Sequence, residues 1–161
     1  MFNRFVKEAR EIATQAQVIA RRQASPTVEA EHLLLALAER PGNSAHTVLA
    51  DAGLGHEELR EALDDENERS LAAVGVSAAA CDLSSVADPA KRPRWATSAN
   101  LALERSLTVA VARGDRRIEP GHILLGLLQA TIGTVPRALE GVDIDPADLE
   151  RRVEASLDQT G

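Results

Sequence analysis

Residues 28–37 read Val-Glu-Ala-Glu-His-Leu-Leu-Leu-Ala-Leu, and residues 118–127 read Ile-Glu-Pro-Gly-His-Ile-Leu-Leu-Gly-Leu. Five of the ten positions are identical, and three more exchange one small or aliphatic residue for another. The same offset of 90 residues aligns residues 5–63 with residues 95–153 without a gap. One register held over so long a stretch indicates an internal repeat.

The spacing of apolar residues predicts four helices in the first copy. The first spans about Arg4 to Arg22, where apolar residues recur every three or four positions and form one stripe. The second spans about Val28 to Glu39 and the third about Ser44 to Ala52, each bounded by proline or glycine. Gly53 suits the left-handed residue that often ends a helix. The fourth helix runs from near His56 to about Asn67.

The second copy repeats this plan. Thr97 is expected to cap the fifth helix, and Pro120 and Pro136 suit the first turns of the sixth and seventh. Asp145, followed by a proline, is expected to cap the eighth. The sequence therefore predicts an all-α fold of eight helices, arranged as two four-helix repeats related by a pseudo-twofold axis.

A repeat of this length is marginal as a separate folding unit, so we expect the two copies to share one core. The prediction is a single domain over residues 1–161, with repeat one at 1–67, a linker at 68–94 and repeat two at 95–157. Residues from Leu71 to Cys81 are rich in alanine and valine. They are expected either to add a short helix or to dock on the surface.

Composition favours a folded chain that does not bind nucleic acid. Hydrophobic residues make up 44% and charged residues 27% of the chain, as in ordinary soluble proteins. The net charge of −7 opposes binding to phosphate backbones. Cys81 is the single cysteine, and the chain has neither a membrane-length apolar run nor the apolar start of a signal peptide. We therefore expect a cytoplasmic protein with no membrane partner.

An acidic run stands out at the end of the first copy. Seven of the twelve residues from Glu57 to Glu68 are Asp or Glu. Such a run usually forms a solvated helix face. The alternative is a surface that meets a basic partner.

The repeated stretch carries the motif E-x-x-H-[LI]-L-L-x-L twice, and the chain opens with M-F-x-R-F. Together with the four-helix pattern, these features resemble the N-terminal domain of the Clp-family AAA+ unfoldases, above all the ClpC type of actinobacteria and other Gram-positive bacteria. The resemblance covers nearly the whole chain outside the linker. It implies the Clp N-domain fold.

In that family the domain docks adaptors, substrates and degradation tags, and it is the target of several cyclic-peptide antibiotics. The sequence holds no G-x-x-x-x-G-K-[ST] loop that would bind nucleotide phosphates. The resemblance thus implies a non-enzymatic Clp-system binding module without ATPase modules and without a cofactor. Such a module would act as a decoy or as a modulator of a ClpC-type unfoldase. A self-contained core indicates a monomer.

The resemblance also implies a phosphoarginine site, which in the family uses the acid of a G-T-E-H motif in each repeat. In the first repeat that acid is Glu31, whereas in the second repeat Gly121 replaces it. Because a guanidinium needs a carboxylate partner, only the first site is a candidate. The chain would then be an adaptor for phosphoarginine proteins. The alternative for Glu31 is a solvated acid in a first helical turn.

A second family surface, which binds the antibiotics, lies on the first and fifth helices near the pseudo-twofold axis. Position-by-position matching gives seven candidate residues for ligand and partner binding in this chain, and Asn100 replaces a family lysine. They are Phe2, Ala13, Gln17, Trp95, Asn100, Leu103 and Glu104. Phe2 and Trp95 have an alternative role as core residues that fill the space between the repeats.

The two motif histidines, His32 and His122, are expected to bond to local backbone. The sequence has no H-x-x-x-H or C-x-x-C pairing, so neither a metal site nor a catalytic site is expected. Two other classes of function remain as alternatives. A helical DNA-binding regulator could use the turn at Gly53-Leu54-Gly55, but the charge opposes it. A small hydrolase lacks any paired acid and base.

Overall fold

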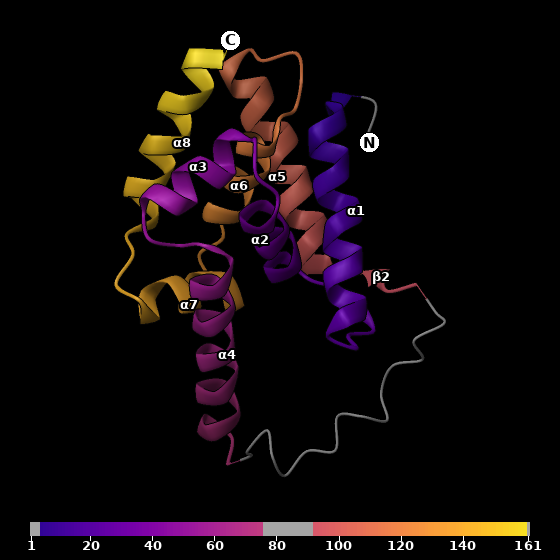
Figure 1. Cartoon of the computed structure of the whole chain (residues 1–161), viewed down its shortest axis with the longest axis vertical. Coiled ribbons are helices and arrows are strands. Elements are labelled where there is room, and N and C mark those ends of the chain that lie inside the picture. The colour runs from indigo at the N-terminus through magenta and orange to yellow at the C-terminus, as the bar shows by residue number, and fades with distance from the viewer. Residues whose placement is uncertain (1–3, 76–91, 161) are drawn as a thin grey trace.

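The computed structural model describes residues 4–75 and 92–160, and in these residues it contains eight helices and two very short strands (Figure 1). The all-α prediction is confirmed. The helices are α1 Lys7–Arg22, α2 Ala30–Glu39, α3 Ser44–Asp51, α4 His56–Ala73, α5 Thr97–Arg113, α6 Pro120–Leu128, α7 Thr134–Gly141 and α8 Pro146–Thr160. The strands are β1 Thr27–Val28 and β2 Arg94–Trp95.

The pairing of extended segments shows the symmetry of the repeat. Val28 pairs in parallel with Trp95 in the two-stranded sheet, and Phe5 forms a parallel bridge with Ile118. Moving each residue by the repeat offset converts one pair into the other, with the two copies exchanged. The same exchange relates the hydrogen bond from Ala96 N–H to the Val28 carbonyl to that from Val6 N–H to the Ile118 carbonyl, both 3.0 Å long. Each copy therefore pairs with the other through equivalent segments.

These pairings correct three predicted helix starts. The first helix begins at Lys7, because the residues before it are extended and the Val6 N–H bonds across the copies. The second begins at Ala30 for the same reason, since Val28 lies in β1. Thr97 is the first residue of α5, and the capping position belongs to Ala96, which is extended. Periodicity could not separate these extended residues from the helices that follow them.

The two copies are interleaved. Helix α4 of the first copy packs on α7 of the second, and α3 packs on α8, while α2 and α6 contact each other at the centre. Leu33, Leu37, Ile123 and Leu127, from the two central helices, are almost fully buried. One shared core results, and the first helix of each copy runs along its outside with α1 and α5 antiparallel (Figure 1).

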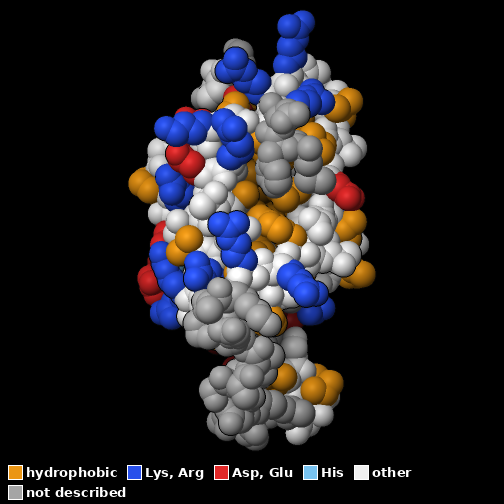
Figure 2. All heavy atoms as spheres, turned by 90° about the vertical axis from the view of Figure 1, so that its right-hand side faces the viewer, with side chains coloured by type: hydrophobic (Ala, Val, Ile, Leu, Met, Phe, Trp, Pro, Cys, Tyr) orange, Lys and Arg blue, Asp and Glu red, His pale blue; other side chains and the backbone are white. Residues whose placement is uncertain are grey.

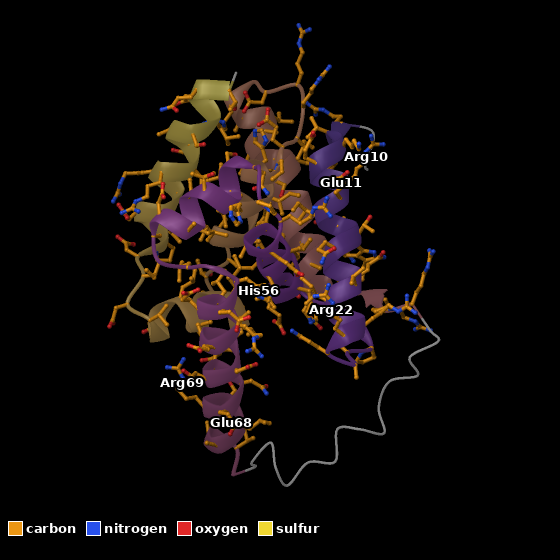
Figure 3. The ribbon with its side chains drawn as sticks, in the orientation of Figure 1. Arg10, Glu11, Arg22, His56, Glu68 and Arg69 are labelled. Carbon is orange, nitrogen blue, oxygen red and sulfur yellow. The ribbon has the colours of Figure 1, made fainter. Side chains whose placement is uncertain are left out.

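Helix α4 differs from its prediction in length and in one side chain. It continues to Ala73, so the first six residues of the expected linker are helical. The last residue of that linker, Arg94, lies in β2. The last turns of α4, with Glu68 and Arg69, project from the body (Figure 3). The acidic run is mostly exposed, as expected, but Glu66 is buried. The segment from Leu71 to Cys81 was expected either to add a short helix or to dock on the surface. Residues 71–73 continue α4, and those after 75 lie outside the described residues.

The chain makes the same turn after α1 and after α5, but with a different residue at the left-handed position. A left-handed residue follows each helix: Ala24, two residues after the end of α1, has a φ of 54°, and Gly114, directly after α5, has a φ of 78°. The next N–H then bonds back to Ala20 or Ala110, in both cases at 2.8 Å. Glycine adopts this backbone conformation easily, whereas alanine is strained there.

Candidate functional site

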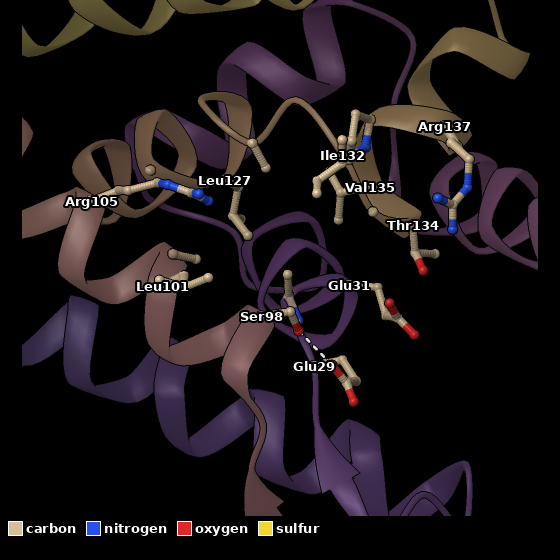
Figure 4. A pocket seen from close by; sticks show the side chains of 16 residues that line it. Glu29, Glu31, Ser98, Leu101, Arg105, Leu127, Ile132, Thr134, Val135 and Arg137 are labelled. Carbon is tan, nitrogen blue, oxygen red and sulfur yellow. Dashed lines mark hydrogen bonds between the residues drawn. The ribbon is translucent and has the colours of Figure 1, made fainter.

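The first copy contains an open pocket of about 460 Å³ at the start of α2. Its walls come from the first turn of α2, from α5, from the end of α6 and from the first turn of α7. Figure 4 shows Arg105 and Leu101 at one end of the pocket, Leu127 and Val135 along it, and Glu31 at the other end. A pocket with apolar walls and a few charged groups is typical of a ligand site.

Glu31 is the principal charged group of the pocket. It lies in the first turn of α2, half-buried, and the Thr134 side chain of α7 lines the same space. No ion pair of Glu31 forms in the part of the chain that the structure describes. Burial, and then the charge of Glu29, raise the pKa of Glu31 above its ordinary value. The carboxylate is therefore placed where a bound cation would be favoured.

Glu29 is held more tightly beside it. Its carboxylate accepts hydrogen bonds from the hydroxyls of Thr27 and Ser98 and from the backbone N–H of His32. The Ser98 hydroxyl also accepts the N–H of Ala30. This network ties the start of α2 to the first turn of α5. It fixes one wall of the pocket and leaves Glu31 as the freer carboxylate.

The opposite end of the pocket combines a cation with apolar surface. Arg105 is half-buried and, within residues 4–75 and 92–160, forms no ion pair. Leu101, beside Arg105 on α5, is 40% exposed, and Ile132, which lies beside Val135 on the side of Glu31 (Figure 4), is 86% exposed. A ligand that covers these two side chains removes apolar surface from water.

A smaller polar cavity of about 260 Å³ shares Glu31, Thr134 and Arg137 with this pocket. Its other walls come from α4, including Asp64 and Glu66. Glu31 thus stands between an apolar space and a polar one. A segment of chain bound there can place different side chains on its two sides.

The equivalent position of the second copy is filled. Gly121 replaces the acid, and a side chain there would begin 2.9 Å from Cδ2 of Leu157 on α8 and 3.2 Å from the Ser44 hydroxyl. Leu157 is 4% exposed. By the repeat offset, Leu157 corresponds to Asn67 and Ser44 to Thr134. The same framework is therefore open in one copy and packed in the other.

The predicted antibiotic surface on α1 and α5 is only partly at the surface. Asn100 and Glu104 are exposed, and Gln17 and Trp95 are half-buried. Figure 2, which faces the side that α1 occupies in Figure 1, shows hydrophobic side chains in a hollow among Lys and Arg.

The other members of that set do not add exposed area. Ala13 and Leu103 are 7% and 1% exposed, so they lie beneath this surface. Trp95 is half-buried and packs against the core. Phe2 lies outside the described residues.

The motif histidines have the structural role that was expected. Nδ1 of His32 accepts the N–H of Glu29 at 2.9 Å, and Nδ1 of His122 accepts that of Glu119 at the same distance. The other ring nitrogens face Gln23 and Asp115. Each ring thus links the start of its helix to the preceding turn. The residues that the structure describes contain no group of three or more potential metal ligands.

Sequence reasoning found Glu31 but missed the residues that complete its pocket. Arg105, Leu101 and Ile132 come from the second copy, and only the interleaving of the copies brings them to the first. Ile132 carried a weak signal, because it is an isolated large apolar residue between two glycine- and threonine-rich stretches. Arg105 carried none.

The fold and the pocket define an all-helical domain built of two similar copies, with an open pocket between them at the start of α2. The comparisons identify the family: the Clp repeat (R) N-terminal domain matches residues 4–88 and 94–160, and this chain belongs to that family. Among solved structures, the N-terminal domain of the chaperone ClpD from Arabidopsis thaliana has the same fold. Its TM-score is 0.70 at 20% identity, covering 98% of this chain and 97% of that one.

Two further proteins show the same relationship. The Hsp104 N-terminal domain from Candida albicans has a TM-score of 0.60 at 17% identity, covering 92% of this chain and 88% of that one. The chloroplastic chaperone protein ClpC2 of Oryza sativa subsp. japonica is 28% identical over 160 residues. That match covers 99% of this chain but 16% of ClpC2, so the chain spans about one sixth of the length of this relative.

None of the helices in the described part of the chain combines the length and the apolar character that crossing a bilayer requires.

Proposed function

We propose that this chain is a protein-interaction module of the Clp system that binds peptide segments of substrates or adaptors in the pocket beside Glu31. The observation that carries the proposal is a half-buried carboxylate without an ion pair among the described residues, facing apolar side chains across an open pocket. A peptide supplies both groups that this arrangement lacks, a cation and an apolar side chain.

The pocket dictates the pose of such a peptide. A Lys or Arg side chain binds Glu31, where the raised pKa shows that the carboxylate is poorly solvated and gains from a cation. A neighbouring apolar side chain covers Leu101 and Ile132. The closed second copy supports a stoichiometry of one segment per molecule, since Leu157 occupies the equivalent space.

A second candidate ligand is phosphoarginine, which a specific feature of the pocket favours. Glu31 and Arg105 line the same space. A phosphorylated guanidinium carries a donor face for a carboxylate and negative oxygens for an arginine. Under this proposal Glu31 binds the guanidinium, Arg105 binds the phosphoryl group, and the chain is an adaptor for phosphoarginine proteins.

The predicted surface on α1 and α5 is separate from the pocket, and for it we propose cyclic-peptide antibiotics or adaptors as ligands. Its exposed candidates are Asn100 and Glu104, with Gln17 and Trp95 partly accessible. Membership of the Clp repeat N-terminal domain family supports a role in which the domain competes for ligands or modulates a ClpC-type unfoldase.

Calorimetric titration of blocked peptides tests the pocket. We would compare acetyl-Ala-Leu-Arg-Ala-amide, its phosphoarginine form and the control acetyl-Ala-Leu-Gln-Ala-amide. Glu31→Gln should weaken both arginine peptides at least about tenfold, the equivalent of 1.4 kcal/mol. Arg105→Ala should weaken only the phosphorylated form. Thr108→Ala, an exposed change on the same helix as Arg105, is the matched control and should change neither affinity.

The affinity for the arginine peptide should also rise with pH through the range above 4.5, because the raised pKa of Glu31 keeps part of the carboxyl protonated there. Equal binding of the glutamine peptide, or binding unaffected by Glu31→Gln, would refute the pocket as the site. A cyclic peptide that binds the Glu31→Gln variant normally but is lost with Trp95→Ala would assign the antibiotic surface to α1 and α5.

A further inference from the structure

A buried ion pair lies behind the wall of the pocket. Glu66 of α4 is 5% exposed and is the one buried carboxylate in the described residues. Its Oε1 accepts hydrogen bonds from Nε of Arg137 at 2.6 Å and from the Ser70 hydroxyl at 2.7 Å. Its Oε2 lies 3.4 Å from the Arg69 guanidinium. Burial alone would raise the pKa of Glu66, but these hydrogen bonds and charges lower it overall, so the group is ionised near neutral pH.

The partner of Glu66 belongs to the pocket itself. Arg137 is in the first turn of α7, and residues 134–137 of that turn form the side of the pocket next to Glu31. Thr134, three residues before Arg137, lines both cavities together with Glu31. A shift of this turn would therefore change both the shape of the pocket and the environment of its carboxylate.

The pair is a weak source of stability, because enclosing the Glu66 carboxylate offsets much of its attraction to Arg137, whose side chain is 53% exposed. It does fix geometry, since a partner left alone in the interior is strongly disfavoured. The projecting end of α4 has few other contacts: Arg69 lies against Gly141 at the end of α7, and apart from Leu71 every residue from Asn67 to Ala73 is exposed. The pair thus joins a sparsely packed helix end to one wall of the pocket.

The second copy serves as a comparison within the same molecule. By the repeat offset, Ser156 corresponds to Glu66 and Thr47 to Arg137. No such ion pair is possible between these residues. In that copy Leu157 packs onto Gly121, and the pocket is filled. The buried pair and the open pocket occur together in one copy, and both are missing from the other.

We propose that Glu66 is a positioning residue which, through Arg137, holds the first turn of α7 in the place that keeps the pocket beside Glu31 open. This inference rests on the proposed function in one respect, the identity of the ligand that the pocket binds. The geometric effect is independent of any ligand, so the two can fail separately.

Hydrogen exchange and methyl NMR on the full chain without ligand provide the first test. Glu66→Leu removes the acceptor for Arg137, and Arg137→Gln breaks the same pair from its exposed side in case the first variant does not fold. Glu66→Gln keeps an acceptor oxygen and is the conservative rescue. Ser70→Ala removes the other hydrogen bond of Glu66 and is the matched control.

The expected result is local. In Glu66→Leu and Arg137→Gln, the amides of α7 should exchange about tenfold faster while those of α3, the equivalent helix, keep their rate. The δ1 methyl signal of Ile132, which lines the pocket, should move, and the signals of core Ile12 and Ile123 should not. Glu66→Gln should stay within about threefold of the wild-type rate, and Ser70→Ala should match it. Unchanged α7 exchange, or equal acceleration in α3, would overturn the positioning role.

Peptide affinity provides the second test. With acetyl-Ala-Leu-Arg-Ala-amide as the probe, Glu66→Leu should bind at least about tenfold more weakly and Glu66→Gln should recover most of the affinity. Wild-type affinity in Glu66→Leu would also overturn the proposal. If the wild-type chain fails to bind the probe, the proposed function is wrong, and the exchange measurement alone decides the role of Glu66.

Discussion

At the scale of single residues, the repeat places different side chains in identical surroundings. Ala24 and Gly114 both have a left-handed backbone and both precede an N–H that bonds back into the helix. Glu31 and Gly121 both begin a central helix, yet one faces an open pocket and the other lies under Leu157. Each copy therefore acts as a control for the other.

Exchanging residues at the two helix ends should change stability in opposite directions. Ala24→Gly should raise the free energy of unfolding by about 0.5–1 kcal/mol, because glycine removes the strain of a left-handed Cβ, an effect partly offset by its greater freedom in the unfolded chain. Gly114→Ala should lower it by a similar amount, about 0.5–1 kcal/mol. Urea unfolding followed by circular dichroism measures both. A change of the same sign in the two variants would contradict this account.

The histidine that begins α2 should make stability depend on pH. Burial lowers the pKa of His32 below 6.5, with the charge of Glu29 opposing the shift. The folded state therefore keeps the ring neutral at a pH where the unfolded chain already binds a proton. Stability from this group is complete above 6.5 and is lost as the pH falls below that value.

His32→Asn removes the titrating ring and keeps a side-chain acceptor for the N–H of Glu29. Denaturant unfolding between pH 7.5 and about 5.5 should show a shallower loss of stability in this variant than in the wild type. Equal slopes would show that His32 is not the group responsible.

At the scale of secondary structure, the sequence predicted the number and order of the helices because apolar periodicity and helix-end residues act locally. It missed β1, β2 and the bridge at Phe5, because two-residue strands have no period and exist only through partners far along the chain. It ended α4 at Asn67, because the last turns have no apolar stripe and an ion pair with α7 holds them. Of the pocket residues, the sequence identified Glu31 through the family resemblance. The residues that line the rest of the pocket could not be predicted, because tertiary contacts bring them together.

The short cross-copy pairing should be testable with proline. Ala96→Pro removes the N–H that bonds to the Val28 carbonyl at 3.0 Å and places a ring carbon against that oxygen. The expected loss is about 1–3 kcal/mol of unfolding free energy. Thr97→Pro is the matched control, since proline is well tolerated at the first position of a helix and should change stability by less than about 0.5 kcal/mol. Equal losses would show that the pairing contributes nothing.

At the scale of the whole molecule, the copies are symmetric in sequence but not separate in space. Each third helix packs on the fourth helix of the other copy, and each extended segment pairs across the copies. Residues 1–75 alone would expose the surfaces that α6, α7 and α8 cover in the whole chain. The sequence predicted one shared core but could not show this interleaving. The repeat offset shows which residues are equivalent, but it does not show whether a helix packs on helices of its own copy or of the other copy.

A fragment of residues 1–75 should therefore be largely unfolded by circular dichroism. Mixed with a fragment of residues 92–161, it should gain helix, and unfolding of the mixture should depend on concentration because folding then requires association. The intact chain, by contrast, should unfold in one transition. Cooperative folding of the first fragment by itself would contradict the interleaved architecture.

The filled position at Gly121 has a consequence for which substitutions the chain tolerates. A side chain at Gly121 would meet Leu157, whereas the equivalent Glu31 lines an open pocket. Where the second copy has Leu157, the first has Asn67. We therefore expect a larger residue at Gly121 to cost more stability than a substitution of similar size at Glu31.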